Sequence, residues 1–109
     1  MTPLQLQLTE AQHQEAVIDL ARACGWLVYH TLNSRGSESG FPDLVLVRGA
    51  RLVFAELKSE RGKVKPDQQV WLDALAVVKG SYDETVEDIV EVYLWRPSDW
   101  REIEQVLAR

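Results

Sequence analysis

The chain of 109 residues contains a single cysteine, Cys24, and only four prolines. One cysteine excludes an intrachain disulfide and a zinc site built from several cysteines, so we expect Cys24 to be a small buried hydrophobic residue. The sequence shows no apolar run long enough to span a bilayer and no basic segment leading into an apolar one. We therefore expect a cytoplasmic protein without a membrane partner.

Positive charge is also scarce in the chain as a whole, which carries a formal net charge of −5. The hydrophobic fraction of 46% and the charged fraction of 27% are ordinary for a globular protein. This length predicts a single domain over residues 1–109. Basic residues are concentrated between positions 48 and 65. That strip could follow a phosphate backbone, or it could be the solvated end of a hairpin.

Residues 41–58 predict a β-hairpin with two apolar arms joined by Gly49 and Ala50. A two-residue loop with glycine first favours a type II′ turn, in which the numbers of paired residues sum to 99. Asp43 then lies opposite Glu56, and Glu56 shares a face of its strand with Lys58. Because opposed like charges destabilise a strand pair, we expect a positive group between the two carboxylates.

The other elements follow from capping signals and apolar periodicity. A capping box at Thr9 to Gln12 predicts a helix that ends near Cys24, and Pro66 predicts the start of a second helix. The apolar hairpin predicts central strands covered by helices on both faces. The complete order is a helix (9–24), three strands (26–32, 43–48 and 51–58), a helix (66–80), a strand (89–95) and a terminal helix from Pro97.

Polar residues stand at the head of two of the buried helical stripes. Glu10 and Gln14 precede the apolar stripe of the first helix, and Gln68 begins that of the second. Alternatively, Glu10 is a neighbour of the capping box and Gln68 an ordinary first-turn residue. These polar residues are less easily explained as unrelated surface groups if their side chains all point to the same place as Asp43 and Glu56.

The motifs resemble those of a known nuclease family. Gly-x-Pro-Asp at 40–43 and Glu-x-Lys at 56–58 resemble the PD-(D/E)XK nuclease superfamily. Gln68 with Trp71, and the Glu10-x-x-x-Gln14 spacing, are similar to its VRR-Nuc branch over roughly residues 9–95. The resemblance implies an α/β fold: a restriction-endonuclease-like αβββαβ core, with a mixed central sheet flanked by helices, plus a C-terminal helix.

The resemblance also implies an activity and a set of catalytic residues. Compact members of this branch are similar to bacterial or phage endonucleases that cut branched DNA, such as four-way (Holliday) junctions, as homodimers. Mg²⁺ or Mn²⁺ would be held by oxygen ligands, which these ions prefer. Lys58 would orient a water molecule and contact the scissile phosphate, and Gln68 would position Lys58 or a substrate phosphate. The expected ligands are Asp43, Glu56, the backbone carbonyl of Leu57 and Glu10, and the catalytic residues are Glu10, Asp43, Glu56, Lys58 and Gln68.

Contacts to DNA are expected from residues beside these motifs. For His30, the alternative is a packed strand residue, because one histidine without a partner is a weak signal. Trp95 and Trp100 offer a surface for dimerisation, or they belong to the core. An alternative function is a catalytically inert DNA- or protein-binding module on the same fold, which the acidic net charge favours. The expected DNA-binding residues are Gln14, His30, Ser34, Arg35, Arg61, Lys63 and Lys65.

Overall fold

The computed structural model describes residues 7–32, 37–80 and 90–109, and their elements appear in the predicted order. No helix in these ranges is long and apolar enough to cross a membrane. The elements are α2 (Glu10–Ala23), β1 (Leu27–His30), β2 (Leu44–Arg48), β3 (Arg51–Leu57), α3 (Pro66–Gly80), β4 (Val90–Trp95), the 3-10 turn η1 (Pro97–Asp99) and α4 (Trp100–Ala108).

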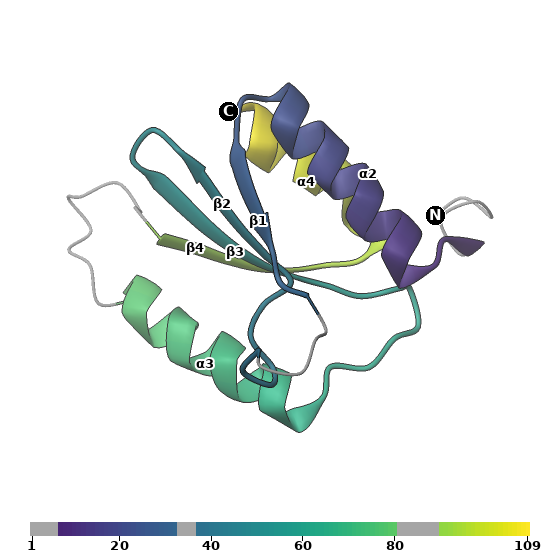
Figure 1. Ribbon diagram of the computed structural model, residues 1–109, viewed down its shortest axis with the longest axis vertical. Coiled ribbons are helices and arrows are strands. Elements are labelled where there is room, and N and C mark those ends of the chain that lie inside the picture. Colours follow the sequence, from purple (N-terminus) through teal and green to yellow (C-terminus); the bar gives the residue numbers. More distant parts are fainter. Residues whose placement is uncertain (1–6, 33–36, 81–89) are drawn as a thin grey trace.

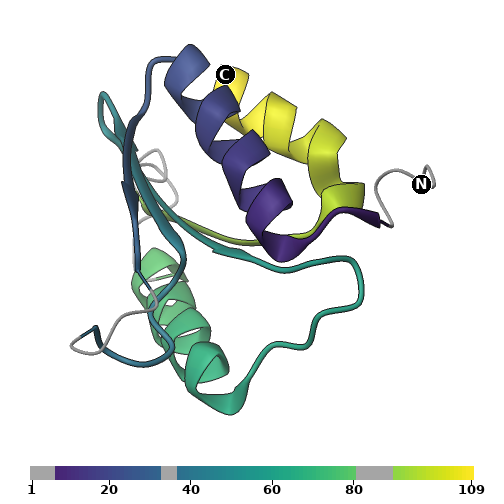
Figure 2. The ribbon, with the colours of Figure 1, turned by 45° about the vertical axis from the view of Figure 1, so that its right-hand side comes forward.

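The four strands form one mixed sheet in the order β1-β2-β3-β4. The first three strands are antiparallel to their neighbours, whereas β4 runs parallel to β3. Helices α2 and α4 lie side by side on one face of the sheet, and α3 lies on the other face (Figures 1 and 2). The predicted restriction-endonuclease-like α/β fold with a C-terminal helix is therefore confirmed.

The register of the β2–β3 hairpin is the predicted one. Leu44 pairs with Ala55, and Arg48 pairs with Arg51, so that the paired numbers sum to 99. Gly49 has a φ of +58°, and no other residue type among those described has a positive φ, which fits a type II′ turn. One step beyond Leu44, the same register places Asp43 opposite Glu56.

The main hydrophobic core lies between the sheet and the helix pair α2 and α4. Trp95 is fully buried there and stacks on Tyr93 with ring centroids 4.8 Å apart, while Trp100 packs against the same core. Core packing thus accounts for both tryptophans, and Cys24 is only partly buried at the edge of this core. Residues with no exposed surface include Val17, Ala21, Leu44, Leu46, Val53, Ala55, Leu57, Ile103 and Leu107.

The opposite face of the sheet is covered less completely. Phe41 makes edge-to-face contacts with Phe54 of β3 and with Trp71 of α3, at centroid distances of 6.2 and 5.0 Å. On the β1–β2 half of this face, Leu27 and Tyr29 are 74% and 65% exposed. The expectation of cover on both faces therefore holds for the β3–β4 half of the sheet, where α3 packs (Figure 1).

The first turn of α2 is held by hydrogen bonds at the protein surface and in the hydrophobic core. The predicted capping box is present, since Thr9 and Gln12 exchange hydrogen bonds of 3.0 and 3.1 Å. One turn later, His13 is fully buried, and burial lowers the pKa of its imidazole. Its Nε2–H donates to the carbonyl of Trp95 at 3.1 Å, and the same carbonyl accepts the Lys58 N–H. This ties α2 to the end of β3 and β4.

Candidate metal centre

Three carboxylates from three different elements meet at one end of the sheet. Glu10 is the first residue of α2, Asp43 immediately precedes β2, and Glu56 is the penultimate residue of β3. One oxygen of each lies within 4.8 Å of the other two. The N-terminal ends of α2 and α3 both lie at this end of the sheet, so Glu10 and Gln68 arrive there from opposite faces (Figure 1).

Glu56 is the most buried of the three carboxylates, with 1% of its surface exposed. Burial, and after it the Asp43 carboxylate, raises the pKa of Glu56 to about 8. The Lys58 ammonium, 3.8 Å from Oε1, opposes this shift. Among the described residues, no N–H or hydroxyl donates to Oε2, and Glu56 can share a hydrogen bond with the Asp43 carboxyl group only when a proton lies between them. Because a buried unpartnered carboxylate is costly, this oxygen and its acidic neighbours fit a divalent cation.

Asp43 is oriented by both neighbouring strands. Its Oδ2 accepts the backbone N–H of Leu57 at 2.8 Å, and its carbonyl accepts the N–H of Thr31 at 2.8 Å. The Thr31 hydroxyl donates to the carbonyl of Pro42 at 2.7 Å. Thr31 thus extends the β1–β2 pairing to the Pro-Asp motif. This role of Thr31 was not predicted from the sequence, although the residue lies in the predicted strand 26–32.

Gln68 links the acidic cluster to the chain that follows β3. Its Nε2 donates to Glu56 Oε1 at 3.0 Å, and its Oε1 accepts the backbone N–H of Lys65 at 2.9 Å. The sequence predicted Lys58 or a substrate phosphate as the partner of Gln68, but in the structure its amide contacts Glu56. Gln68 therefore fixes Oε1 of Glu56 and makes no hydrogen bond to Oε2.

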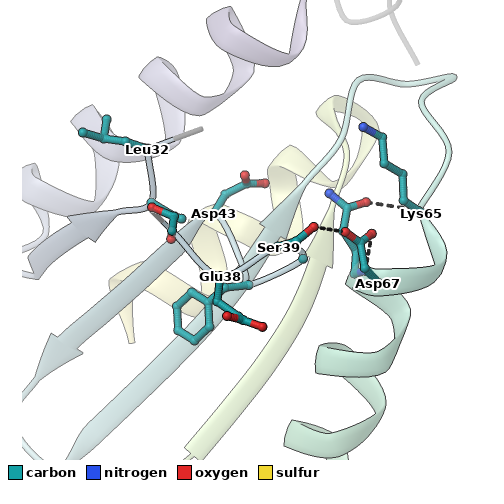
Figure 3. Close-up of a pocket in the computed structure, with 11 residues that line it drawn as sticks. Leu32, Glu38, Ser39, Asp43, Lys65 and Asp67 are labelled. Carbon is teal, nitrogen blue, oxygen red and sulfur yellow. Dashed lines mark hydrogen bonds between the residues drawn. The ribbon is translucent and has the colours of Figure 1, made fainter. Parts of the chain in front are cut away.

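Gly40 allows the first turn of α3 to reach this position. It has a φ of +88°, and a Cβ placed on it would lie 2.9 Å from the Gln68 nitrogen and closer still to the Asp67 carbonyl. No other amino acid fits such an approach without moving the helix. Ser39 reinforces the contact by donating from its hydroxyl to the Asp67 carboxylate (Figure 3).

Two cavities open on either side of Asp43. The smaller, about 290 Å³, lies between residues 37–41 and the start of α3, and Figure 3 shows Asp43, Glu38, Ser39, Lys65 and Asp67 around it. The larger, about 400 Å³, is lined by residues from α2 and β1 as well as by Asp43. Thr31, Leu32 and Asp43 line both cavities. Of the three carboxylates, Asp43 lines both cavities, Glu10 lines the larger one, and Glu56 lines neither.

The predicted DNA-binding residues are spread around these cavities. Gln14 and His30 line the larger cavity together with Glu10, and Lys65 lines the smaller one. Arg61 and Lys63 are exposed on the chain between β3 and α3. Ser34 and Arg35 lie outside the described residues.

Comparison with known proteins gives one informative result. Searches of curated proteins and of solved structures give no significant match. The family model of the VRR-NUC domain matches residues 4–86, a span that includes all three carboxylates as well as Lys58 and Gln68. A VRR-NUC domain is a nuclease-type domain that processes DNA. The match covers most of the chain, which therefore belongs to the VRR-NUC family.

Proposed function

We propose that the protein is a Mg²⁺- or Mn²⁺-dependent endodeoxyribonuclease that hydrolyses phosphodiester bonds in branched DNA. The observation that carries the proposal is the convergence of Glu10, Asp43 and Glu56 within 4.8 Å, with Lys58 beside them. A structural ion-pair network would balance these acidic groups, whereas among the described residues the one ion pair of the cluster joins Lys58 to Glu56. Unbalanced acidic groups around an open cavity are typical of a catalytic metal site.

The side chains of Glu10, Asp43 and Glu56, with the backbone carbonyl of Leu57, would hold the ion. When bound, Mg²⁺ or Mn²⁺ would neutralise charge developing on the phosphate and lower the pKa of water at the site. The chain prepares two of these ligands. Asp43 is fixed through Oδ2 by the Leu57 N–H, and Glu56 is fixed through Oε1 by Gln68.

Lys58 and Gln68 complete the proposed site. Lys58 is only 4% exposed, so its ammonium is held near Glu56 and cannot move freely in solvent. It would orient the attacking water and contact a non-bridging oxygen of the scissile phosphate, which offsets negative charge as the phosphorus–oxygen bond breaks. Gln68 would act by keeping Glu56 in place.

Branched DNA and a homodimer are the finer parts of the proposal. They rest on the resemblance of residues 9–95 to family members that cut branched DNA as homodimers. Cutting two strands symmetrically requires two sites related by a two-fold axis, which a homodimer supplies. The exposed Arg61 and Lys63, together with Lys65, Gln14 and His30 at the cavities, would contact the DNA backbone.

The test is cleavage of labelled four-way, flap and linear duplex DNA by the purified protein in Mg²⁺ or Mn²⁺. We expect cutting of a branched substrate, and a loss of at least about 100-fold in Lys58→Ala and Asp43→Asn. Lys79→Ala, at the far end of α3, should cut like the wild type. Absence of cleavage by the wild type, or equal cleavage by wild type and Lys58→Ala, would overturn the proposal.

Calorimetric titration with Mg²⁺ separates the enzyme from the inert binding module. The proposed enzyme takes up the ion, and Asp43→Asn does not. A protein that binds DNA but takes up no ion in either form would instead be the binding module, whose acidic net charge of −5 would then confine DNA affinity to local basic patches.

A further inference from the structure

Residues 59–65, which lead from Lys58 after β3 to the start of α3, form a connection that extends away from the sheet as a wide loop (Figure 2). Its cationic side chains Arg61, Lys63 and Lys65 are all exposed. Its acidic residue, Glu60, directs Oε2 to the backbone N–H of Ser98 at 3.0 Å. The carboxylate is therefore engaged with η1, and the outer surface of the connection is left to the cations.

Arg96, the residue after β4, determines the shape of this connection. Its Nη1 lies within hydrogen-bonding distance of three backbone carbonyls, at 2.8 Å from Ser59, 3.2 Å from Glu60 and 2.7 Å from Gly62. The Gly62 N–H also donates to the Ser59 carbonyl at 3.2 Å. Residues 59–62 thus curl around one guanidinium group.

The direction of these carbonyls bears on anion binding. Carbonyl oxygens repel phosphate oxygens, and an ordinary surface turn exposes them to the solvent. Here three of them accept hydrogen bonds from Arg96, while the side chains of Arg61 and Lys63 are exposed to an approaching phosphate. Hydrogen bonds to a charged donor are also stronger than neutral ones, which favours one conformation of the connection before any ligand binds.

Both ends of the connection are joined to the proposed active site. At its start, the Lys58 N–H donates to the carbonyl of Trp95, the residue before Arg96, at 3.1 Å. At its end, the Lys65 N–H donates to Gln68, which also holds Glu56. The backbone that carries the cations is therefore anchored at both ends relative to the carboxylates.

We propose that Arg96 is a positioning residue, which holds residues 59–65 as a preformed binding surface for the phosphates flanking the cut. The inference rests on the proposed nuclease function and adds a determinant of DNA affinity. Arg96 itself need not touch the DNA. Arg96 would raise DNA affinity by fixing the conformation of residues 59–65, whereas a residue of direct contact would bind the phosphate itself.

The experiment compares Arg96→Gln with Arg101→Gln, which removes the same charge from an exposed position on α4. Steady-state cleavage should show KM for DNA raised about tenfold in Arg96→Gln, with kcat changed less than about twofold. Amide hydrogen exchange of residues 59–65 in the free protein should become faster. Arg101→Gln should match the wild type in all three measurements.

A double-mutant cycle distinguishes positioning from direct contact. With binding measured in EDTA, Arg61→Gln should weaken DNA affinity more in the wild-type background than in Arg96→Gln, because the displaced connection no longer presents Arg61. Additive losses, unchanged exchange of residues 59–65, or an unchanged KM would each overturn the proposal. If Arg96→Gln does not fold, Arg96→Lys against Arg101→Lys carries the same test.

Failure of the proposed function is recognised separately. Uptake of Mg²⁺ depends on Asp43 and is expected to be within about twofold of wild type in Arg96→Gln. If the wild type takes up no ion, the proposed nuclease function falls, whereas the exchange and DNA-affinity results in EDTA still decide the role of Arg96.

Discussion

At the scale of single residues, Glu56 carries the main electrostatic cost of the site. Burial and the nearby Asp43 carboxylate raise its pKa to about 8. In the metal-free protein, Glu56 is thus protonated at neutral pH, while an unfolded chain would have ionised it. Its contribution to stability is present below its unfolded pKa and is lost as the pH rises through about 8.

Metal affinity should therefore depend on pH in a defined direction. An ion must displace the Glu56 proton, so the association constant for Mg²⁺ should rise about tenfold per pH unit towards pH 8 and level off above it. Calorimetry in two buffers of different ionisation enthalpy measures the released proton. The pKa of His13 is lowered below the usual 6.5, so His13 does not contribute to a titration above that value. A constant affinity across this interval would contradict the raised pKa.

The role of Gln68 in supporting the site can be tested with a substitution of the adjacent Gln69 as the control. Gln68→Leu removes the donor to Glu56 and the acceptor for Lys65. Because groups that orient metal ligands matter almost as much as the ligands, kcat should fall about ten- to a hundredfold. Gln69→Leu loses only the exposed bond to Asp73 at 2.8 Å, and it should leave kcat within about twofold of wild type. Equal rates in the two variants would show that Gln68 does not support the site.

At the scale of elements, the site depends on how closely α3 approaches the chain before β2. Gly40 and Asp67 meet without room for a side chain, and this contact sets the position of Gln68. A similar constraint acts on the other helix. Its buried His13 binds the Trp95 carbonyl one turn after Glu10. Each helix therefore delivers a polar residue to the carboxylate cluster because its first turn is fixed.

Gly40 and Gly49 both have a positive φ, but only Gly40 lies against other backbone atoms. Substituting each with alanine therefore distinguishes the cost of backbone strain alone from the cost of strain and a steric clash together. Gly49→Ala places a methyl group in open space and should lower the free energy of unfolding by about 1 kcal/mol. Gly40→Ala adds a collision with the α3 backbone, so we expect a loss of about 3 kcal/mol or more, together with reduced cleavage. Urea denaturation measures both losses. Similar losses in the two variants would mean that α3 adjusts freely.

The fold could be predicted because its signals are local. The capping box at Thr9, Pro66 at the start of α3 and Gly49 in the hairpin each fix nearby backbone through bonds spanning a few residues. The hairpin register then placed Asp43 opposite Glu56. Every one of these predictions needed only residues that are close in the sequence or matched by the family motifs.

The supporting contacts could not be predicted because they join distant parts of the chain. Arg96 binds carbonyls more than thirty positions earlier, and Gly40 meets Asp67 across the site. The partner of Gln68 was also open, since spacing alone does not show which way an amide points. Such contacts depend on how α3 and α4 pack, which apolar periodicity leaves undetermined.

At the scale of the whole molecule, the two faces of the sheet are covered unequally. Helices α2 and α4 fill one face, where Leu44 and Leu46 have no exposed surface. On the other face, Leu27 of β1 lies opposite Val47 of β2, and they are 74% and 38% exposed. Neighbouring exposed apolar side chains on an edge of a sheet favour association with another chain. This half-face is therefore the candidate interface for the proposed homodimer.

Leu27→Glu and Val77→Glu give a matched test of that interface, because the two side chains are 74% and 73% exposed. Val77 lies on α3, which packs against β4 at the other side of the sheet from β1. Sedimentation velocity should show the wild type and Val77→Glu at twice the 12.4 kDa chain mass, and Leu27→Glu as a monomer, because buried like charges oppose a two-fold contact. Paired cuts in a four-way junction should become single cuts in Leu27→Glu. A monomeric wild type would contradict the homodimer, and a dimeric Leu27→Glu would exclude this half-face as its interface.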